Sequence, residues 1–249
     1  MTILAKATAL ILAATSTYAD GAIGYTVLGQ PYEGHLSTVE DARGIIVQFP
    51  TTRGLSDHEI GNAARFAAEG WSSFAVDVHG AGKLPSTMEE RDAGRDMLLG
   101  DEALRLAIAR AAIEEASRQT DGDIVVIGFS MGGGIAAEVA RSGLGEDLGV
   151  DGYGIFSGRV DDRAGRMMPE GTAPFFVARG SADSRIAIGD LAVFEEDAEM
   201  AGVPYRIELY DGKDHMFHAE VSPNFDADAA GHVWAAFGEF LAALPVSGG

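Results

Sequence analysis

Apolar runs alternate with amphipathic stretches along nearly the whole chain. Short Val-, Ile- and Phe-rich runs are typical of buried strands, and apolar residues spaced three or four apart predict helices. The predicted strands are 44–49, 73–78, 124–127, 152–156, 173–178 and 205–210. The predicted helices are 60–68, 102–117, a segment starting at 132, 191–200 and 227–244. This alternation predicts an α/β fold, with a mostly parallel central sheet and helices on both faces.

The length of the chain fits a single domain, preceded by a segment of different character. At 249 residues and 26.0 kDa, the chain can bury one sizeable α/β core. Residues 1–6 carry one lysine, 7–14 are apolar, and small residues stand at Thr17 and Ala19. This pattern predicts a signal peptide at 1–19, cleaved after Ala19, a single domain at 20–249, and a periplasmic or secreted protein. The alternative is that this segment is the first strand or helix of the domain.

Two further observations bear on the N-terminal segment. Its apolar part is too short to be a membrane-spanning helix. The chain has no cysteine, which fits export because no thiol is exposed to oxidation outside the cytoplasm. The lack of cysteine also excludes a cysteine nucleophile.

The clearest candidate for chemistry is the G-x-S-x-G motif at 128–132. It follows the apolar run 124–127 and precedes a Gly- and Ala-rich helix start, which is the context of the nucleophile elbow in α/β-hydrolases. A serine on such a sharp turn needs neighbours without side chains, and Gly128 and Gly132 provide them. The turn raises the Ser130 hydroxyl above the sheet and directs a helix N-terminus at a developing oxyanion. The alternative is that Ser130 only caps the helix.

A nucleophilic serine needs a base and an acid that orients the base. In α/β-hydrolases both follow the serine in the chain, in the order acid and then histidine. Asp183 lies just past the predicted strand 173–178, and His215 lies in the turn after the strand 205–210. Functional groups collect at the carboxyl ends of parallel strands. We therefore expect His215 to be the base and Asp183 to fix its tautomer.

Other polar residues compete for these roles. His218 is an alternative base if the turn is built differently. Asp211 and Asp214 are too close to His215 in sequence to orient it and are interpreted as turn residues, and Asp190 is expected to cap or open a helix. The remaining histidines show no metal-ligand spacing, so no metal site is expected; they are His35, His58, His79 and His232.

The sequence resembles the dienelactone hydrolase family of α/β-hydrolases from about residue 25 to 244. The similar segments are Tyr32–Leu36, Gly54–His58 leading into Ala63–Trp71, Gly128–Gly133, Tyr210–Phe217, and the closing Trp234 and Phe240. The resemblance implies a nucleophile at Ser130, an acid at Asp183 and a base at His215. It also implies an oxyanion hole formed by the backbone N–H groups of Met131 and Thr52.

Two departures from the family pattern affect the expected substrate. The namesake enzymes have cysteine at the elbow, where this chain has Ser130, and a glutamate that restrains the thiol, where this chain has Thr51. The two changes agree, since a serine has no thiolate to restrain. The expected function is therefore cleavage of a carboxylic ester or lactone through an acyl-enzyme, with no metal or organic cofactor. The alternative is an exported, non-catalytic member of the fold that binds a small molecule; a serine peptidase is disfavoured because the chain has no room for an extra domain.

Net charge narrows the range of partners. The chain has 18 basic and 38 acidic residues, a net charge of −20, which repels nucleic acid and anionic membranes. We expect a small-molecule substrate, no nucleic-acid or membrane partner, and a monomer or small homo-oligomer. Strongly anionic substrates are disfavoured unless Arg53, Arg91 or Arg95 lies near the pocket. The long polar loop 79–99 is expected either to border that pocket or to be a plain surface connection.

Overall fold

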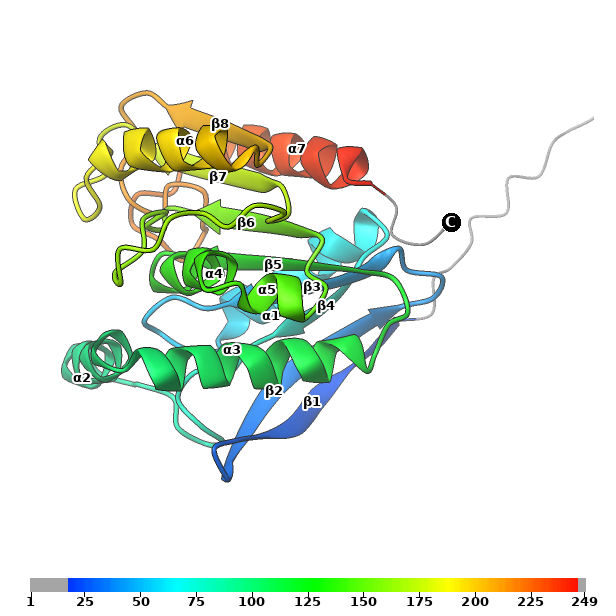
Figure 1. Ribbon diagram of the computed structural model, residues 1–249. Coiled ribbons are helices and arrows are strands. Elements are labelled where there is room, and N and C mark those ends of the chain that lie inside the picture. Colours follow the sequence, from blue (N-terminus) through cyan, green and yellow to red (C-terminus); the bar gives the residue numbers. More distant parts are fainter. Residues whose placement is uncertain (1–17, 246–249) are drawn as a thin grey trace, which may run out of the picture.

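One eight-stranded sheet organises the molecule (Figure 1). The computed structural model describes residues 18–245. The strand order is β1-β2-β4-β3-β5-β6-β7-β8. The pairs β1–β2 and β2–β4 are antiparallel, and all the other neighbouring strands pair in parallel. The strands are β1 (Tyr18–Val27), β2 (Gln30–Val39), β3 (Gly44–Phe49), β4 (Ser72–Ala75), β5 (Asp123–Phe129), β6 (Gly152–Phe156), β7 (Phe175–Gly180) and β8 (Tyr205–Tyr210). The predicted α/β fold with a mostly parallel sheet is confirmed.

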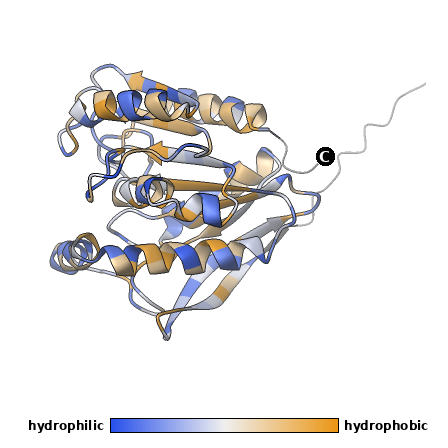
Figure 2. Cartoon of the chain, in the orientation of Figure 1, coloured by the Kyte–Doolittle hydropathy of each residue, from blue (hydrophilic) through white to orange (hydrophobic). Residues whose placement is uncertain are grey.

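Helices cover both faces of this sheet. They are α1 (Asp57–Ala68), α2 (Met88–Gly100), α3 (Glu102–Ser117), α4 (Met131–Arg141), α5 (Leu144–Asp147), α6 (Gly189–Ala201) and α7 (Ala227–Ala243). Buried residues of α3, α4 and α6 form one apolar cluster against the sheet, and those of α1 and α7 form a second cluster on the opposite face. In Figure 2, α3 carries both hydrophilic and hydrophobic positions, as expected of a helix with one buried face.

The segment predicted as a loop at 79–99 contains a helix, so that prediction was wrong in part. Helix α2 occupies Met88–Gly100, and Leu98 is its one buried residue. Because the helix is polar on nearly all sides, its sequence lacks the apolar positions, three or four residues apart, from which a helix is predicted. Its start does carry a signal, a capping box in which Thr87 and Glu90 hydrogen-bond to each other's backbone N–H. Similarly, a capping box at Ser56 and Glu59 starts α1 three residues earlier than predicted.

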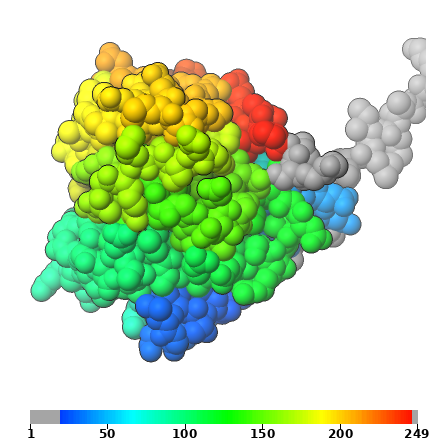
Figure 3. All heavy atoms as spheres, viewed as in Figure 1, coloured from blue at the N-terminus to red at the C-terminus, as the bar shows by residue number. Residues whose placement is uncertain are grey.

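The N-terminal hairpin precedes the first strand that the apolar pattern predicted, at 44–49. β1 and β2 pair over their full length, and the hairpin projects beyond the helices in the space-filling view (Figure 3). Most of the predicted signal peptide, residues 1–17, lies outside the described residues. The predicted cleavage point after Ala19 falls two residues into β1. Between residues 18 and 245, no helix combines the length and apolarity needed to cross a membrane.

Candidate active site

Ser130 lies at the sharp turn between β5 and α4. Its backbone has φ 53° and ψ −110°, a strained conformation for a residue with a side chain. The flanking glycines leave room for the turn, because a Cβ on Gly128 would lie 2.1 Å from the Gly132 carbonyl oxygen. A Cβ on Gly132 would lie 2.2 Å from the carbonyl oxygen of Phe49. The Ser130 N–H donates to the Phe156 carbonyl at 2.9 Å, which ties the turn to β6. The backbone therefore has the elbow geometry that the motif predicts.

The structure brings the three predicted side chains together at one edge of the sheet. The Ser130 Oγ lies 2.9 Å from the Nε2 of His215. On the other side of the ring, the His215 Nδ1 lies 2.9 Å from Oδ2 and 3.1 Å from Oδ1 of Asp183. Asp183 follows β7 and His215 follows β8, so neighbouring parallel strands deliver both groups. The imidazole thus bridges the hydroxyl and the carboxylate.

Asp183 is held in its ionised form by hydrogen bonds. Its side chain has no exposed surface, and burial alone raises the pKa of a carboxyl group. The hydrogen bond from His215 and the backbone N–H groups of Arg185 and Ile186, which donate to Oδ1 at 2.9 Å, outweigh burial and lower the pKa of Asp183. An ionised Asp183 accepts the N–H of His215 Nδ1, which leaves Nε2 free to take a proton from Ser130.

Three neighbouring residues hold the backbone around His215. The Asp214 carboxylate accepts the His215 N–H at 2.6 Å, and the Asn224 side chain donates to the His215 carbonyl at 2.9 Å. The next N–H, that of Met216, donates to the Ser157 hydroxyl at 3.1 Å. Asp211 is a turn residue, as interpreted from the sequence, whereas Asp214 lies in the irregular stretch between two turns. The sequence analysis missed Asn224 and Ser157, because no motif distinguishes a single polar loop residue.

The competing residues lie in other environments. The His218 ring is 2% exposed, and its Nε2 lies 3.3 Å from the hydroxyl of Ser157, not from that of Ser130. Burial is the main cause that lowers the pKa of His218 to about 3, so this ring is neutral. Asp190 stands in the first turn of α6 and pairs with the buried Arg179 at 3.2 Å. Within residues 18–245, no three His, Asp or Glu side chains converge as a metal site would require.

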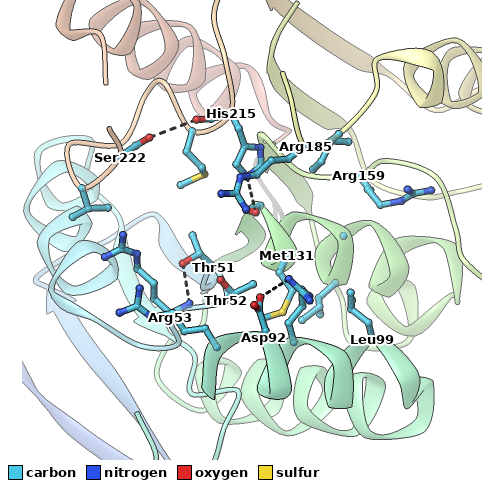
Figure 4. A pocket seen from close by; sticks show the side chains of 18 of the residues that line it. Thr51, Thr52, Arg53, Asp92, Leu99, Met131, Arg159, Arg185, His215 and Ser222 are labelled. Carbon is cyan, nitrogen blue, oxygen red and sulfur yellow. Dashed lines mark hydrogen bonds and ion pairs between the residues drawn. The ribbon is translucent and has the colours of Figure 1, made fainter. Parts of the chain in front are cut away.

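A cavity of about 680 Å³ opens in front of Ser130 and His215 (Figure 4). Thr52, which follows β3, and Met131, the first residue of α4, line it together. The N–H of a first helical residue has no acceptor within its own helix. Helix α2 forms another wall, which confirms that the segment 79–99 borders the pocket.

Arginines dominate the charge of this cavity. Seven of the 18 basic residues of the chain line it, against three acidic residues. These arginines are Arg53, Arg91, Arg95, Arg105, Arg159, Arg163 and Arg185. Three of them are paired with carboxylates: Arg95 with Asp92 and Asp96, Arg105 with Glu138, and Arg159 with Asp161. Anionic substrates were expected to be disfavoured unless arginine 53, 91 or 95 lies near the pocket, and all three line it.

The other four lining arginines, 53, 91, 163 and 185, have no carboxylate partner within residues 18–245. The Nε of Arg91 is buried without a hydrogen-bond partner in the described chain. The pKa of Arg163 is lowered by burial and then by the positive charges of Arg159 and Arg105, whose effects are each larger than the opposing effects of Asp161 and Glu138. A like-charge effect of this kind marks a region of positive potential. The cavity therefore has the opposite charge balance to the chain as a whole.

Comparison with known proteins places this site in a family. The sequence profile of the dienelactone hydrolase family matches residues 33–244. The chain belongs to the dienelactone hydrolase family. It is a hydrolase of the α/β-hydrolase fold, as its sequence resemblance implied. A search of curated proteins returns no match to the chain.

Solved structures of dienelactone hydrolase-like proteins and esterases share the fold. The dienelactone hydrolase-like promiscuous phosphotriesterase P91 from metagenomic libraries is 23% identical, with a TM-score of 0.81 over 91% of this chain and 98% of that one. A putative dienelactone hydrolase from Klebsiella pneumoniae is 17% identical, with a TM-score of 0.73 over 91% and 99%. Esterase 2 of Thermogutta terrifontis, phosphonylated by cyclosarin, is 17% identical, with a TM-score of 0.67 over 89% and 94%.

Proposed function

We propose that this member of the dienelactone hydrolase family is a serine hydrolase that cleaves carboxylic esters or lactones through an acyl-enzyme. The observation that carries the proposal is the bridge made by His215, whose ring nitrogens lie 2.9 Å from the Ser130 hydroxyl and 2.9 Å from the Asp183 carboxylate. A nucleophile, a base and an orienting acid at hydrogen-bond distance form the arrangement that acyl transfer requires.

The proposed reaction has two halves that mirror each other. The Ser130 oxygen attacks the carbonyl carbon while its proton passes to the Nε2 of His215. The tetrahedral intermediate then breaks its bond to the leaving oxygen, which takes the proton from Nε2 and departs as an alcohol. Water next attacks the acyl-enzyme and gives its proton to Nε2. Cleavage of the acyl bond returns that proton to Ser130 and releases the acid; in a lactone, the acid and alcohol remain one molecule.

The backbone N–H groups of Met131 and Thr52 are the proposed oxyanion donors. Both residues line the cavity beside Ser130 (Figure 4), and Met131 begins a helix whose dipole favours negative charge at that end. A donor of this kind contributes about 2.7–4 kcal/mol to stabilising the transition state.

The arginines of the cavity favour an ester or lactone that carries a negative charge. Four guanidinium groups without a carboxylate partner leave hydrogen-bond donors for an anion, and one of them, Arg185, lines the cavity together with His215 (Figure 4). A guanidinium suits a carboxylate because its N–H groups match the two oxygens in spacing. We therefore propose a carboxylate-bearing ester or lactone as the preferred substrate.

The first test is hydrolysis of p-nitrophenyl acetate by the purified protein and by Ser130→Ala. The proposal expects turnover that Ser130→Ala abolishes, and a mass increase of one acyl group on the parent when the reaction is quenched early. Equal rates for the two proteins would overturn it. Saturable binding of a small molecule without turnover on a panel of esters would instead favour the non-catalytic alternative.

A second test addresses substrate charge. The 4-nitrophenyl monoester of glutaric acid and 4-nitrophenyl valerate have acyl chains of equal length, and only the first carries a carboxylate. We expect kcat/KM to favour the glutarate, and Arg91→Met and Arg185→Met to reduce that preference. Arg118→Met, on an exposed residue after α3, is the control and should leave the ratio unchanged. A ratio insensitive to both cavity substitutions would refute the charge preference.

Export is a separate part of the proposal. The pattern of residues 1–19 supports a cleaved signal peptide and a periplasmic or secreted enzyme. Expression of the full chain in a Gram-negative host, followed by mass measurement of the periplasmic protein, should give a mature N-terminus at Asp20. A cytoplasmic protein that retains residues 1–19 would overturn this part alone.

A further inference from the structure

A buried polar pair lies beside the turn that carries His215 and does not line the cavity. Ser157 directly follows β6 and has no exposed surface, and His218 is 2% exposed. Aromatic rings surround the His218 ring, with centroids 6.1 Å away for Phe129, 5.6 Å for Phe156 and 5.4 Å for Phe217. Burying polar groups among aromatic rings is costly unless they are hydrogen-bonded. Apolar packing alone does not explain why two polar side chains are buried here.

The hydrogen bonds of the pair lead to the backbone next to His215. The Ser157 Oγ accepts the N–H of Met216 at 3.1 Å and lies 3.3 Å from the Nε2 of His218. The Ser157 hydroxyl therefore accepts the Met216 N–H and shares a second hydrogen bond with the Nε2 of His218, whose Nδ1 has no partner within residues 18–245. Two hydrogen bonds therefore fix the position of the Ser157 hydroxyl.

Both ends of the Ser157–Met216 hydrogen bond have unusual backbones. Ser157 has φ 48° and Met216 has φ 56°, values that residues with side chains rarely adopt. The Ser157 N–H donates to the Ala178 carbonyl of β7 at 2.9 Å, which anchors Ser157 to the sheet. Met216 has no glycine to ease its conformation, so a contact from outside the turn must help to hold it. Because Met216 directly follows His215, anchoring its N–H fixes the peptide plane between the two residues and so restrains the backbone that carries the imidazole.

We propose that Ser157 and His218 are positioning residues that hold the imidazole of His215 in line with the Ser130 hydroxyl. The relay runs from His218 to the Ser157 hydroxyl, and from there to the Met216 N–H. This inference rests on the proposed function, since it assigns a purpose to residues that serve the base of that reaction. Neither residue contacts the cavity, so their effect on the reaction passes through His215.

Substitutions in the parent enzyme test the relay with 4-nitrophenyl ester turnover. Ser157→Gly removes the hydroxyl and tolerates the positive φ, and Ser157→Ala removes the hydroxyl alone. We expect both to lower kcat by 10- to 100-fold with KM within twofold. His218→Leu should do the same, whereas His218→Gln, which keeps an acceptor near the position of Nε2, should retain kcat within threefold.

The control is a serine with the same local role elsewhere. Ser72 is also buried, and its Oγ accepts a backbone N–H, that of Val39, at 3.0 Å. Ser72→Ala should reduce thermal stability but leave kcat unchanged. If folded Ser157→Gly and Ser157→Ala both keep kcat within threefold, or if His218→Gln loses as much activity as His218→Leu, the relay is refuted.

A measurement without turnover separates this inference from the proposed function. The proton between the His215 Nδ1 and Asp183 should give a low-field proton resonance in the parent protein, whether or not esters are cleaved. We expect this resonance to broaden or vanish in Ser157→Gly at temperatures well below unfolding, and to persist in Ser72→Ala. An unchanged resonance in Ser157→Gly overturns the relay. A parent that shows the resonance but cleaves no ester overturns only the proposed function.

Discussion

Replacement of Asp183 by asparagine removes one charge from the site and tests the assignment of the base. In the structure, Oδ1 of Asp183 accepts two backbone N–H groups at 2.9 Å, from Arg185 and Ile186. An asparagine at 183 keeps these bonds only if its oxygen takes the position of Oδ1. Its NH₂ group then occupies the position of Oδ2, 2.9 Å from the Nδ1 of His215. An NH₂ group can only donate there, so Nδ1 must become the acceptor and the hydrogen must move to Nε2.

The size of the effect follows from this change of tautomer. With a hydrogen on Nε2, His215 cannot accept the proton of Ser130, although all three side chains stay in place. The same exchange in a chymotrypsin-fold protease lowers kcat about 10⁴-fold. We expect a loss of about 10⁴-fold in kcat/KM for Asp183→Asn, equal to about 5.5 kcal/mol at about 1.4 kcal/mol per factor of ten.

The assay is 4-nitrophenyl ester hydrolysis near neutral pH, with circular dichroism and thermal melts to verify folding. Asp214→Asn is the matched control, because it makes the same chemical change one residue before His215. Asp214 needs only a carbonyl-type acceptor for the N–H groups of Ser184 and His215, which asparagine supplies. We expect this control to keep kcat/KM within about tenfold of the parent. A folded Asp183→Asn enzyme that also stays within tenfold would refute the tautomer argument.

Three further predictions concern stability. Gly132→Ala places a Cβ 2.2 Å from a β3 carbonyl oxygen and should prevent folding of an active elbow, whereas Gly134→Ala meets nothing closer than 4.0 Å and should raise the melting temperature. Arg105→Met leaves the buried carboxylate of Glu138 with only the longer contact to Arg166, at 3.7 Å, and should cost about 3 kcal/mol by urea denaturation, which additional Glu138→Leu should largely restore. Burial lowers the pKa of His58 to about 4, below the value of about 6.5 for an unfolded histidine. As the pH falls, His58 is therefore protonated in the unfolded chain before it is protonated in the folded one. The free energy of unfolding should fall as the pH is lowered from about 7 to 4, by up to about 1.4 kcal/mol per pH unit for this residue. The decrease should be less steep in His58→Gln.

The sequence was sufficient to predict the sheet core and the positions of the site residues along the chain. Buried parallel strands consist of continuous apolar runs, and the carboxyl ends of β5, β7 and β8 lie at one sheet edge whatever their loops do. Any functional group placed just past such a run, as Asp183 and His215 are, can therefore be brought to that edge. The prediction depended on the strands being parallel, which their alternation with helices indicates, and not on loop conformation.

Helix α2 and the charge of the cavity could not be predicted in the same way. α2 buries one residue, so its apolar pattern is weak, and only the capping box at Thr87 indicates where it starts. The arginines of the cavity come from segments spread between Arg53 and Arg185. Nothing in their local sequence shows that they face a common space. Their convergence is a property of how loops pack against α2 and α3, and it meets the condition under which a chain of net charge −20 was expected to accept an anionic substrate.

Backbone strain occurs both at a site residue that was predicted from the sequence, Ser130, and at two neighbours that were not, Ser157 and Met216. Among residues 18–245, five residues other than glycine have positive φ: Leu28, Asp41, Ser130, Ser157 and Met216. The first two lie in turns at the ends of β2, where local geometry accounts for them. The other three surround His215, and each is tied by a backbone or hydroxyl hydrogen bond to a neighbouring strand or turn. Flanking glycines mark the strained turn of Ser130 in the sequence. Ser157 has only Gly158 beside it, outside any recognisable motif, and Met216 has no neighbouring glycine. Strain that is stabilised by distant contacts can be recognised only once the fold has brought those contacts together.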